Sequence, residues 1–295
     1  MSEFVEKIRR EWGANDAKRD AAFKTPQDII RFDDILYEKD KIFNKLDVYR
    51  PKNIPQNKKI PVILNVHGGG WVYGTKETYQ FYGMELARQG FAVVNFTYRL
   101  APESKYPASI EDTNSVVKWI FANKDVYGFD LNNFFATGDS AGAHLLSIYT
   151  AALSDKSFAD RFNFDLVKDF NFKAIVLNCG KYSFKEEVYS DQDLLKEILA
   201  EDTPQNRDML ETVEHISPAY PPVYIMTCTG DFLREQSVLL ASALTEKSVP
   251  FEYHYVKDAK INLWHCYQNN IDLDAAKQCH QDECNFFKKF TGEVK

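Results

Sequence analysis

The sequence has no long apolar run and no cluster of basic residues. No stretch among its 295 residues approaches the roughly 18 apolar residues that a membrane-spanning helix requires, so we expect no membrane insertion. The formal net charge is −7, and the basic pairs Lys58-Lys59 and Lys288-Lys289 are short. Because nucleic-acid binding depends on clustered Lys and Arg, we expect no nucleic-acid partner.

Cysteine is scarce, and its arrangement argues against disulfides. The chain has an odd number of cysteines: Cys179, Cys228, Cys266, Cys279 and Cys284. Residues 1–20 are charged throughout and contain no apolar core of a signal peptide. We therefore expect a cytoplasmic protein with reduced thiols. Cys279 and Cys284 flank His280 without a second ligand pair, so we expect no metal site.

The overall composition is that of an ordinary globular domain, with 44% hydrophobic and 27% charged residues. Short apolar runs rich in β-branched and aromatic residues predict strands at 62–66, 91–98, 134–137, 174–178, 223–229 and 251–256. Helices are predicted at 78–89, 109–123, 141–153 and 235–247, with a closing helix after Tyr267. This alternation predicts a single α/β domain over residues 1–295, with mostly parallel strands buried on both faces.

Two segments interrupt this alternation. Residues of about 180–220 carry charges and several aromatics but no clear strand, and they lie between two predicted strands. Residues 1–40 are rich in charge and compatible with helix. An insertion on the carboxyl side of the sheet lies where α/β proteins bind their ligands. We therefore expect a helical cap formed by residues of about 1–40 and about 180–220.

A G-x-S-x-G sequence stands at the junction of a predicted strand and a predicted helix. It reads Gly138-Asp139-Ser140-Ala141-Gly142. In this context the pattern is a nucleophile elbow, in which a strained turn exposes the serine and the glycines let strand and helix approach closely. The helix amino terminus adds partial positive charge where an oxyanion would form. The motif predicts Ser140 as a nucleophile and Asp139 as a hydrogen-bonding residue for neighbouring loops.

A glycine-rich segment, His67-Gly68-Gly69-Gly70-Trp71, follows the predicted strand 62–66. Consecutive glycines let backbone N–H groups turn toward a substrate oxygen. A phosphate cradle usually ends in Lys, whereas this loop continues to Tyr73. We expect His67 to anchor the loop rather than act as a base. The expected oxyanion-hole donors are the amides of Gly68, Gly69 and Ala141.

The base and its orienting acid are expected after the serine, in the order Ser, Asp, His. His265 lies in the loop between the last predicted strand and the closing helix. Asp231 follows the predicted strand 223–229, so its carboxylate lies at the same edge of the sheet as Ser140. Asp258 is an alternative acid, although it lies close to His265 in the sequence. We predict Ser140, Asp231 and His265 as a catalytic triad.

Four motifs together resemble the hormone-sensitive-lipase-like carboxylesterases, the GDSAG branch of the α/β-hydrolase superfamily. They are HGGGW at 67–71, YRLAPE at 98–103, GDSAG at 138–142 and GDFLRE at 230–235. The resemblance extends from about residue 46, where residues 46–51 look like the family's first strand, to the closing helix. It implies an eight-stranded, mostly parallel sheet, a helical cap and hydrolysis of short-acyl esters without a cofactor. It also implies the same triad and oxyanion-hole donors.

Two places depart from that family's pattern. Ala143 and His144 follow the elbow, where the family often has a glycine. Cys266 and Tyr267 follow His265, where relatives more often place Gly or Ser before an aromatic. These two residues are expected to reshape the substrate pocket. The full set of expected pocket residues is Trp71, Tyr73, Asp139, Cys266 and Tyr267.

The motifs predict a serine carboxylesterase that acts on a small ester through an acyl-enzyme. An amide or formamide hydrolase with the same triad is the nearest alternative. A non-catalytic ligand-binding homologue is a third, but such modules typically lose the Ser or the His, and this chain keeps both. The expected partner is a small-molecule ester, and the sequence is compatible with a homodimer.

Overall fold

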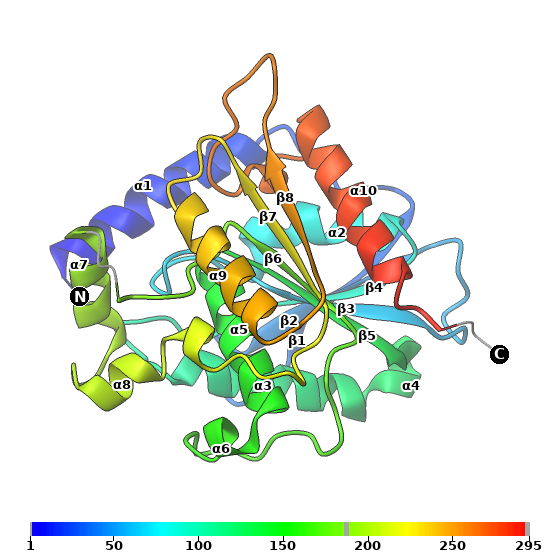
Figure 1. The fold of residues 1–295 in the computed structure, drawn as a ribbon. Coiled ribbons are helices and arrows are strands. Elements are labelled where there is room, and N and C mark those ends of the chain that lie inside the picture. The colour runs from blue at the N-terminus through cyan, green and yellow to red at the C-terminus, as the bar shows by residue number, and fades with distance from the viewer. Residues whose placement is uncertain (1, 186–188, 293–295) are drawn as a thin grey trace.

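The structure, a computed structural model, describes residues 2–185 and 189–292. Its centre is an eight-stranded sheet with the order β1-β2-β4-β3-β5-β6-β7-β8 (Figure 1). The strands are β1 Ile29–Leu36, β2 Lys45–Pro51, β3 Ile60–Val66, β4 Ala92–Phe96, β5 Phe129–Asp139, β6 Ile175–Asn178, β7 Val223–Cys228 and β8 Phe251–Val256. Only β2 pairs antiparallel, with β1 and with β4, and the other pairs are parallel. The predicted eight-stranded, mostly parallel sheet is confirmed.

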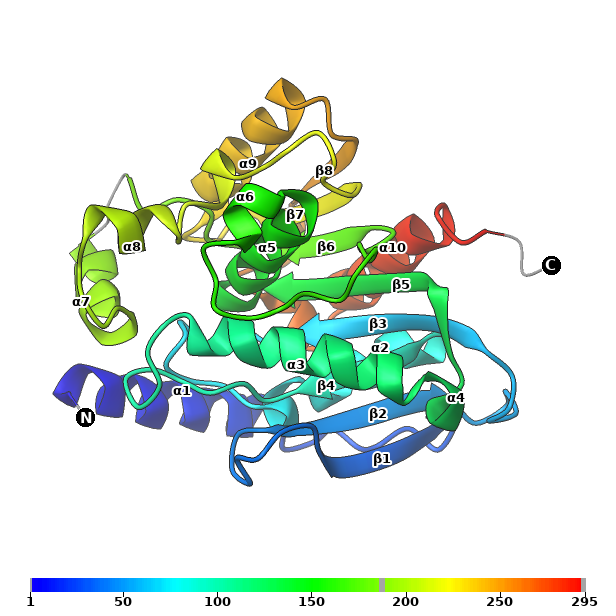
Figure 2. The ribbon, with the colours of Figure 1, turned by 90° about the horizontal axis from the view of Figure 1, so that it is seen from below.

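Helices cover both faces of the sheet, which explains why its central strands are apolar throughout (Figure 2). In β3, Val62, Leu64 and Val66 belong to one hydrophobic cluster, whereas Ile63 belongs to another. Neighbouring side chains of a strand point to opposite faces, so each cluster fills one layer. The first layer contains α3 Ala108–Ala122, α5 Ala141–Ser154 and α9 Arg234–Glu246. The second contains α2 Gln80–Arg88 and α10 Asp274–Lys288.

The predicted strands and helices are all present, but the edge strand β1 was not predicted. In β1 only Ile29 is buried, and the strand pairs with β2 alone. Its polar and partly exposed side chains carry no continuous apolar run that would predict a strand. The expectation that residues 1–40 belong to the cap is therefore wrong for residues 29–36, which extend the sheet.

The segments predicted to form a cap contain helix α1 and the insertion between β6 and β7. Helix α1 spans Glu3–Asp20, and the insertion contains α7 Tyr189–Ile198, α8 Pro204–Asp208 and the short 3-10 helix η2 Thr212–Glu214. Both views show α1 and α7 at the same end of the sheet (Figures 1 and 2). No helix within residues 2–185 and 189–292 is long and apolar enough to cross a membrane.

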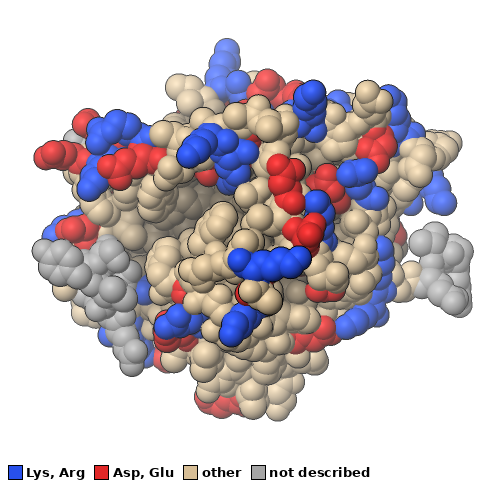
Figure 3. All heavy atoms as spheres, turned by 90° about the horizontal axis from the view of Figure 1, so that it is seen from above, with Lys and Arg blue, Asp and Glu red and all other residues tan. Residues whose placement is uncertain are grey.

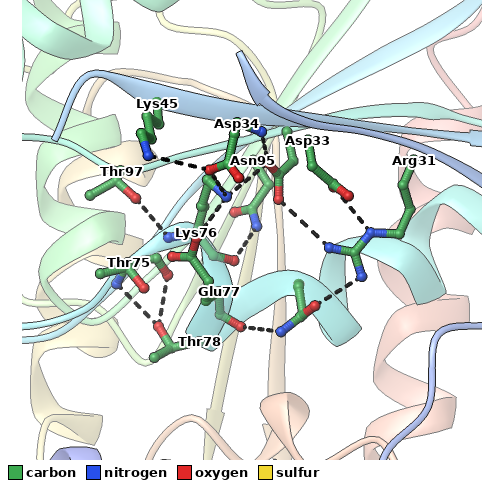
Figure 4. A network of polar contacts seen from close by, with 12 residues as sticks. Arg31, Asp33, Asp34, Lys45, Thr75, Lys76, Glu77, Thr78, Asn95 and Thr97 are labelled. Carbon is green, nitrogen blue, oxygen red and sulfur yellow. Dashed lines mark hydrogen bonds and ion pairs between the residues drawn. The ribbon is translucent and has the colours of Figure 1, made fainter. Parts of the chain in front are cut away.

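A polar network around the buried Lys76 and Asp47 joins strands β1 and β2 to the 3-10 helix η1, Lys76–Tyr79 (Figure 4). The Nζ atom of Lys76 lies 2.9 Å from Asp47 Oδ1, 3.2 Å from Asp34 Oδ1 and 2.6 Å from Glu77 Oε1. Burial lowers the pKa of Lys76, but its hydrogen bonds to Glu77 and Asp47 outweigh burial and raise that pKa. The lysine therefore stays charged, and it holds β1 and β2 against η1.

Candidate active site

Strand β5 ends at a strained turn that presents Ser140 at the start of helix α5. Ser140 has φ 51° and ψ −118°, a conformation that residues with a Cβ rarely adopt. Its amide donates to the carbonyl oxygen of Asn178 at 2.9 Å, which ties the turn to the end of β6. A Cβ on Gly142 would lie 2.1 Å from the carbonyl oxygen of Val66. The close approach of α5 to β3 therefore requires glycine at this position.

Ser140, His265 and Asp231 form a chain of hydrogen bonds. His265 Nε2 lies 2.9 Å from Ser140 Oγ, and His265 Nδ1 lies 2.7 Å from Asp231 Oδ1. Because an ionised carboxylate only accepts, Nδ1 carries the proton and Nε2 is left to accept from the serine hydroxyl. The alternative acid, Asp258, instead accepts from two backbone amides of its own loop.

The surroundings of Asp231 keep it ionised. Its Oδ2 accepts from Thr227 Oγ1 at 2.7 Å, and its Oδ1 accepts from the amide of Leu233 at 2.9 Å. Burial raises the pKa of Asp231, but His265 and these donors outweigh burial and hold that pKa below its usual value. Burial lowers the pKa of His265, but hydrogen bonds to Asp231 and Cys179 outweigh it and raise that pKa. The carboxylate therefore stabilises the positive charge that His265 gains when it accepts a proton.

The loop after β3 is anchored by His67. The imidazole stacks on Tyr98 with ring centroids 4.0 Å apart, and its Nδ1 lies 2.7 Å from the carbonyl oxygen of Gly68. The hydroxyl of Tyr98 also donates to the carbonyl oxygen of His67 at 2.8 Å. Burial lowers the pKa of His67 to about 4, so the ring stays neutral at physiological pH. His67 therefore holds the glycine loop, and its side chain contacts the carbonyl oxygen of Gly68 rather than Ser140 Oγ.

The amides predicted to form an oxyanion hole come from two segments, the glycine loop after β3 and the start of α5. Gly69 has φ +120°, and a Cβ there would lie 2.0 Å from the carbonyl oxygen of Tyr73, so the turn requires glycine. Gly69 and Ser140 line the same cavity, whereas Gly68 is not part of its wall. Ala141 opens α5, and a first-turn amide has no acceptor inside its own helix.

A cavity of about 1060 Å³ adjoins Ser140 and His265. Its wall combines aromatic side chains with charged and amide groups from α1 and from the loop after His265. The aromatic members are Trp12, Trp71, Tyr73, Tyr79, Phe232 and Trp264. Figure 3 shows this face of the molecule hollowed, with charged side chains around the hollow. A concave, largely apolar wall with a few polar groups suits a small organic molecule.

Comparison with known proteins identifies the family. A model of the BD-FAE family matches residues 46–244. The chain belongs to the BD-FAE family. The versiconal hemiacetal acetate esterase of Dothistroma septosporum is 28% identical over 241 residues, covering 72% of this chain and 68% of that protein. Carboxylesterase NlhH of Mycobacterium tuberculosis is 29% identical over 219 residues, covering 70% of this chain and 66% of NlhH.

Solved structures show the same fold as this BD-FAE member. Esterase B from Lactobacillus rhamnosis, in a tributyrin phosphonate complex, matches with a TM-score of 0.90 and 24% identity. That match covers 98% of this chain and 96% of Esterase B. The family and its esterase relatives confirm the resemblance to α/β-hydrolase carboxylesterases and the prediction of a carboxylic ester hydrolase.

The predicted pocket residues of this BD-FAE member divide into two groups. Trp71, Tyr73 and Cys266 line the cavity, whereas Asp139 and Tyr267 do not. Asp139 Oδ2 instead accepts from Tyr79 and Asn269, each at 3.0 Å, and so ties the elbow to two loops. Tyr267 is 1% exposed and packs in the layer of α2 and α10. The expectation that these two residues belong to the pocket is wrong, because both are buried behind its wall.

His144, a departure from the family pattern, links the glycine loop to the cap. The indole of Trp71 donates to His144 Nδ1 at 3.2 Å, and His144 Nε2 lies 2.8 Å from the carbonyl oxygen of Leu210. Because Nδ1 accepts, Nε2 carries the proton and donates to that carbonyl. Burial lowers the pKa of His144 to about 4, so the ring is neutral. This side chain therefore fixes the position of Trp71 in the cavity wall.

The cavity residues of helix α1 were not predicted individually. Trp12 packs edge to face on Tyr73 with ring centroids 6.0 Å apart, and the hydroxyl of Tyr73 donates to Asp16 at 2.7 Å. Only Val5 and Ile8 are buried in this 18-residue helix. With so few buried apolar positions, no stripe in the sequence marks the face that meets the cavity.

Proposed function

We propose that this BD-FAE protein is a serine esterase that hydrolyses short-acyl carboxylic esters through an acyl-enzyme on Ser140. The observation that carries the proposal is the hydrogen-bond chain from Asp231 through His265 to Ser140 Oγ, at the wall of a cavity of about 1060 Å³. Acyl transfer requires a nucleophile within reach of a base, and a third group that orients the base.

In the proposed acylation, His265 Nε2 accepts the hydroxyl proton as Ser140 Oγ attacks the ester carbonyl carbon. Asp231 holds the ring in its Nδ1-protonated form and stabilises the imidazolium without taking the proton. His265 then returns the proton to the leaving alcohol oxygen as the ester C–O bond breaks. In deacylation, His265 takes a proton from water, which attacks the acyl carbon, and the proton returns to Ser140.

The amides of Gly68, Gly69 and Ala141 are proposed to donate to the oxyanion of the tetrahedral intermediate. The first turn of α5 adds a partial positive charge next to that oxygen. Loss of one such donor typically raises the barrier by about 2.7–4 kcal/mol. A Cβ on Gly68 would lie 2.9 Å from the carbonyl oxygen of Asp139, so glycine at position 68 lets the loop approach the residue before Ser140, which supports this role.

Two observations support a short acyl group. The relative from Dothistroma septosporum is named for an acetate ester, the shortest common acyl group of this kind. In this chain, Trp71 is held between His144 and Phe184, whose ring centroid lies 5.6 Å from its own. A bulky side chain fixed in this way leaves less room for a long acyl chain.

Covalent labelling tests the nucleophile directly. We expect a fluorophosphonate to add once to the wild type, with peptide mapping placing the adduct on Ser140. The Ser140→Ala variant should fold and remain unlabelled, and Ser147→Ala, a buried serine of the same helix, should label like the wild type. Labelling of Ser140→Ala, or none in folded wild type, would overturn the proposal.

A substrate series tests the reaction and its specificity. We expect kcat/KM for 4-nitrophenyl esters to be highest for acetate to butyrate and to fall as the acyl chain lengthens. Matched anilides should react far more slowly than the esters. A faster anilide would favour the amidase, and a maximum at long acyl chains would overturn short-acyl specificity.

A further inference from the structure

Thiol groups gather around the imidazole of His265. The Sγ atoms of Cys179 and Cys266 and a ring nitrogen of His265 all lie within 4.8 Å of one another. Among the residues that the structure describes, this is the one group of His, Cys, Asp or Glu side chains with metal-ligand spacing. All five cysteines are free, so these thiols are available as ligands.

The backbone directs both thiols toward His265 at a conformational cost. Cys179 follows strand β6 with φ 48°, and Cys266 follows His265 with φ 57°. Both values lie in the left-handed region, where a residue with a Cβ costs of order 1–3 kcal/mol. The amide of Cys179 donates to the carbonyl oxygen of Met226 at 2.7 Å, which fixes that turn against β7. Cys266 lines the cavity, so an ion can reach the cluster from solvent.

We propose that Cys179, Cys266 and His265 bind a soft divalent cation, represented by Zn²⁺, and that the bound ion blocks the active site. Thiolate and imidazole are the ligands that Zn²⁺ prefers, with Zn–S near 2.3 Å and Zn–N near 2.0–2.1 Å. Water from the cavity supplies a fourth ligand. Coordination replaces the protons of the two thiols, and both protons pass to solvent.

The charges around the cluster favour a cation. Asp231 is buried and accepts a hydrogen bond from His265 Nδ1, so its carboxylate lies directly beside the cluster. Asp139, also buried, lies near Cys266, and its Oδ1 has no hydrogen-bond partner within the described residues. A divalent cation at this site would therefore lie beside two carboxyl groups. Within the described residues, neither carboxyl group is hydrogen-bonded to a Lys or an Arg.

A cation bound at this site would prevent His265 from acting as the proposed base. His265 Nδ1 is hydrogen-bonded to Asp231, and Nε2 to Ser140. A cation on either nitrogen displaces one of these partners, so the imidazole can no longer accept the proton of Ser140. The inhibition therefore rests on the proposed function, whereas binding of the ion does not. The bound ion takes no part in the reaction itself.

Binding is tested with Cd²⁺, whose bonds to thiolates absorb in the ultraviolet. We expect one Cd²⁺ per chain in wild type and in Ser140→Ala, which tests binding independently of turnover. Cys266→Ala and Cys179→Ser should lose the absorption. Cys284→Ala, which removes a buried thiol of α10 outside the cluster, should retain it. Equal absorption in Cys266→Ala, or none in folded wild type, would overturn the site.

Inhibition is tested with Zn²⁺ and reversal by a chelator, with each variant compared with its own zinc-free rate. We expect Cys266→Ala to raise the inhibition constant of Zn²⁺ at least about tenfold. Even the loss of a residue that only hydrogen-bonds a metal ligand typically weakens metal binding by that factor. Cys284→Ala should match the wild type. Equal inhibition of wild type and Cys266→Ala would refute the assignment. If the wild type lacks esterase activity, the Cd²⁺ measurement still decides whether the ion binds.

Discussion

Asp47 and Asp231 are two buried carboxylates with similar surroundings, but only Asp231 belongs to the candidate active site. Each is 1% exposed, and each contacts a basic side chain, Lys76 for Asp47 and His265 for Asp231. Lys76 Nζ has three N–H donors and three carboxylate partners, so its network is saturated. His265 instead offers Nε2 to Ser140 beside the cavity. Both carboxylates are thus buried and paired, and the candidate site differs in its contact with the strained Ser140 and with the cavity.

The largest expected effect comes from Asp231→Asn. This change leaves the shape of the side chain but favours the wrong tautomer of His265, so we expect kcat to fall about 10⁴-fold. Ester hydrolysis measured under saturating substrate checks this result. Asp258→Asn is the matched control, and its kcat should stay within about twofold of wild type, the range expected for a surface change. A loss below tenfold for Asp231→Asn would remove Asp231 from the mechanism.

Lys76→Met tests the other half of the comparison. It leaves the buried Asp47 with only Arg31, 4.0 Å away, as a cation partner, so we expect the free energy of unfolding in urea to fall by about 3 kcal/mol, the lower end for a broken buried pair. The kcat of the folded variant should match the wild type. As a control, Lys156→Met breaks the exposed Lys156–Asp160 pair and should cost no more than about 1 kcal/mol. Loss of activity with unchanged stability would contradict a purely structural role for Lys76.

Glu283 is a buried carboxyl without a cation partner among the described residues, and it sharpens the comparison through pH. Its Oε1 accepts from Asn178 at 2.7 Å and its Oε2 from Tyr82 at 2.8 Å, and burial raises its pKa to about 7 from 4.5. Because this pKa is higher in the folded state, the stabilisation is present below pH 4.5 and is lost as pH rises through 7.

The variant Glu283→Gln removes that titration. Between pH 5 and pH 8, we expect the wild type to lose up to about 3 kcal/mol of unfolding free energy relative to the variant, at about 1.36 kcal/mol per pKa unit. Urea denaturation of both proteins across this pH range measures the difference. A difference that stays constant with pH would show that Glu283 has an ordinary pKa.

The smallest effect is expected at the hydrogen bond from Trp71 of the glycine loop to the uncharged His144. Trp71→Phe keeps an aromatic ring but removes the donor to His144, a hydrogen bond of about 1 kcal/mol. We expect kcat/KM for 4-nitrophenyl butyrate to fall about fivefold, the factor that about 1 kcal/mol produces. An unchanged kcat/KM would mean that packing alone positions Trp71.

The sequence predicted those parts of the molecule whose local pattern matches their environment. Strand β3 is apolar throughout because helices cover both its faces, and Ser140 stands in a turn that sterically requires Gly142. Strand β1 was missed because an edge strand needs no continuous apolar run. Tyr267 and Asp139 were misplaced because the fold determines whether a residue beside the reacting groups faces the cavity or the core, and neighbourhood in sequence does not.

The cavity wall joins parts of the chain that a ribosome makes at very different times. Trp12 of α1 and Trp264 both line the cavity, and roughly 250 residues, or about 10–50 s at about 5–20 residues per second, separate their synthesis. Helix α1 therefore leaves the ribosome long before Phe232, Trp264 and His265 exist. Under the proposed mechanism, a nascent chain that has not reached His265 holds Ser140 without its base and cannot hydrolyse an ester.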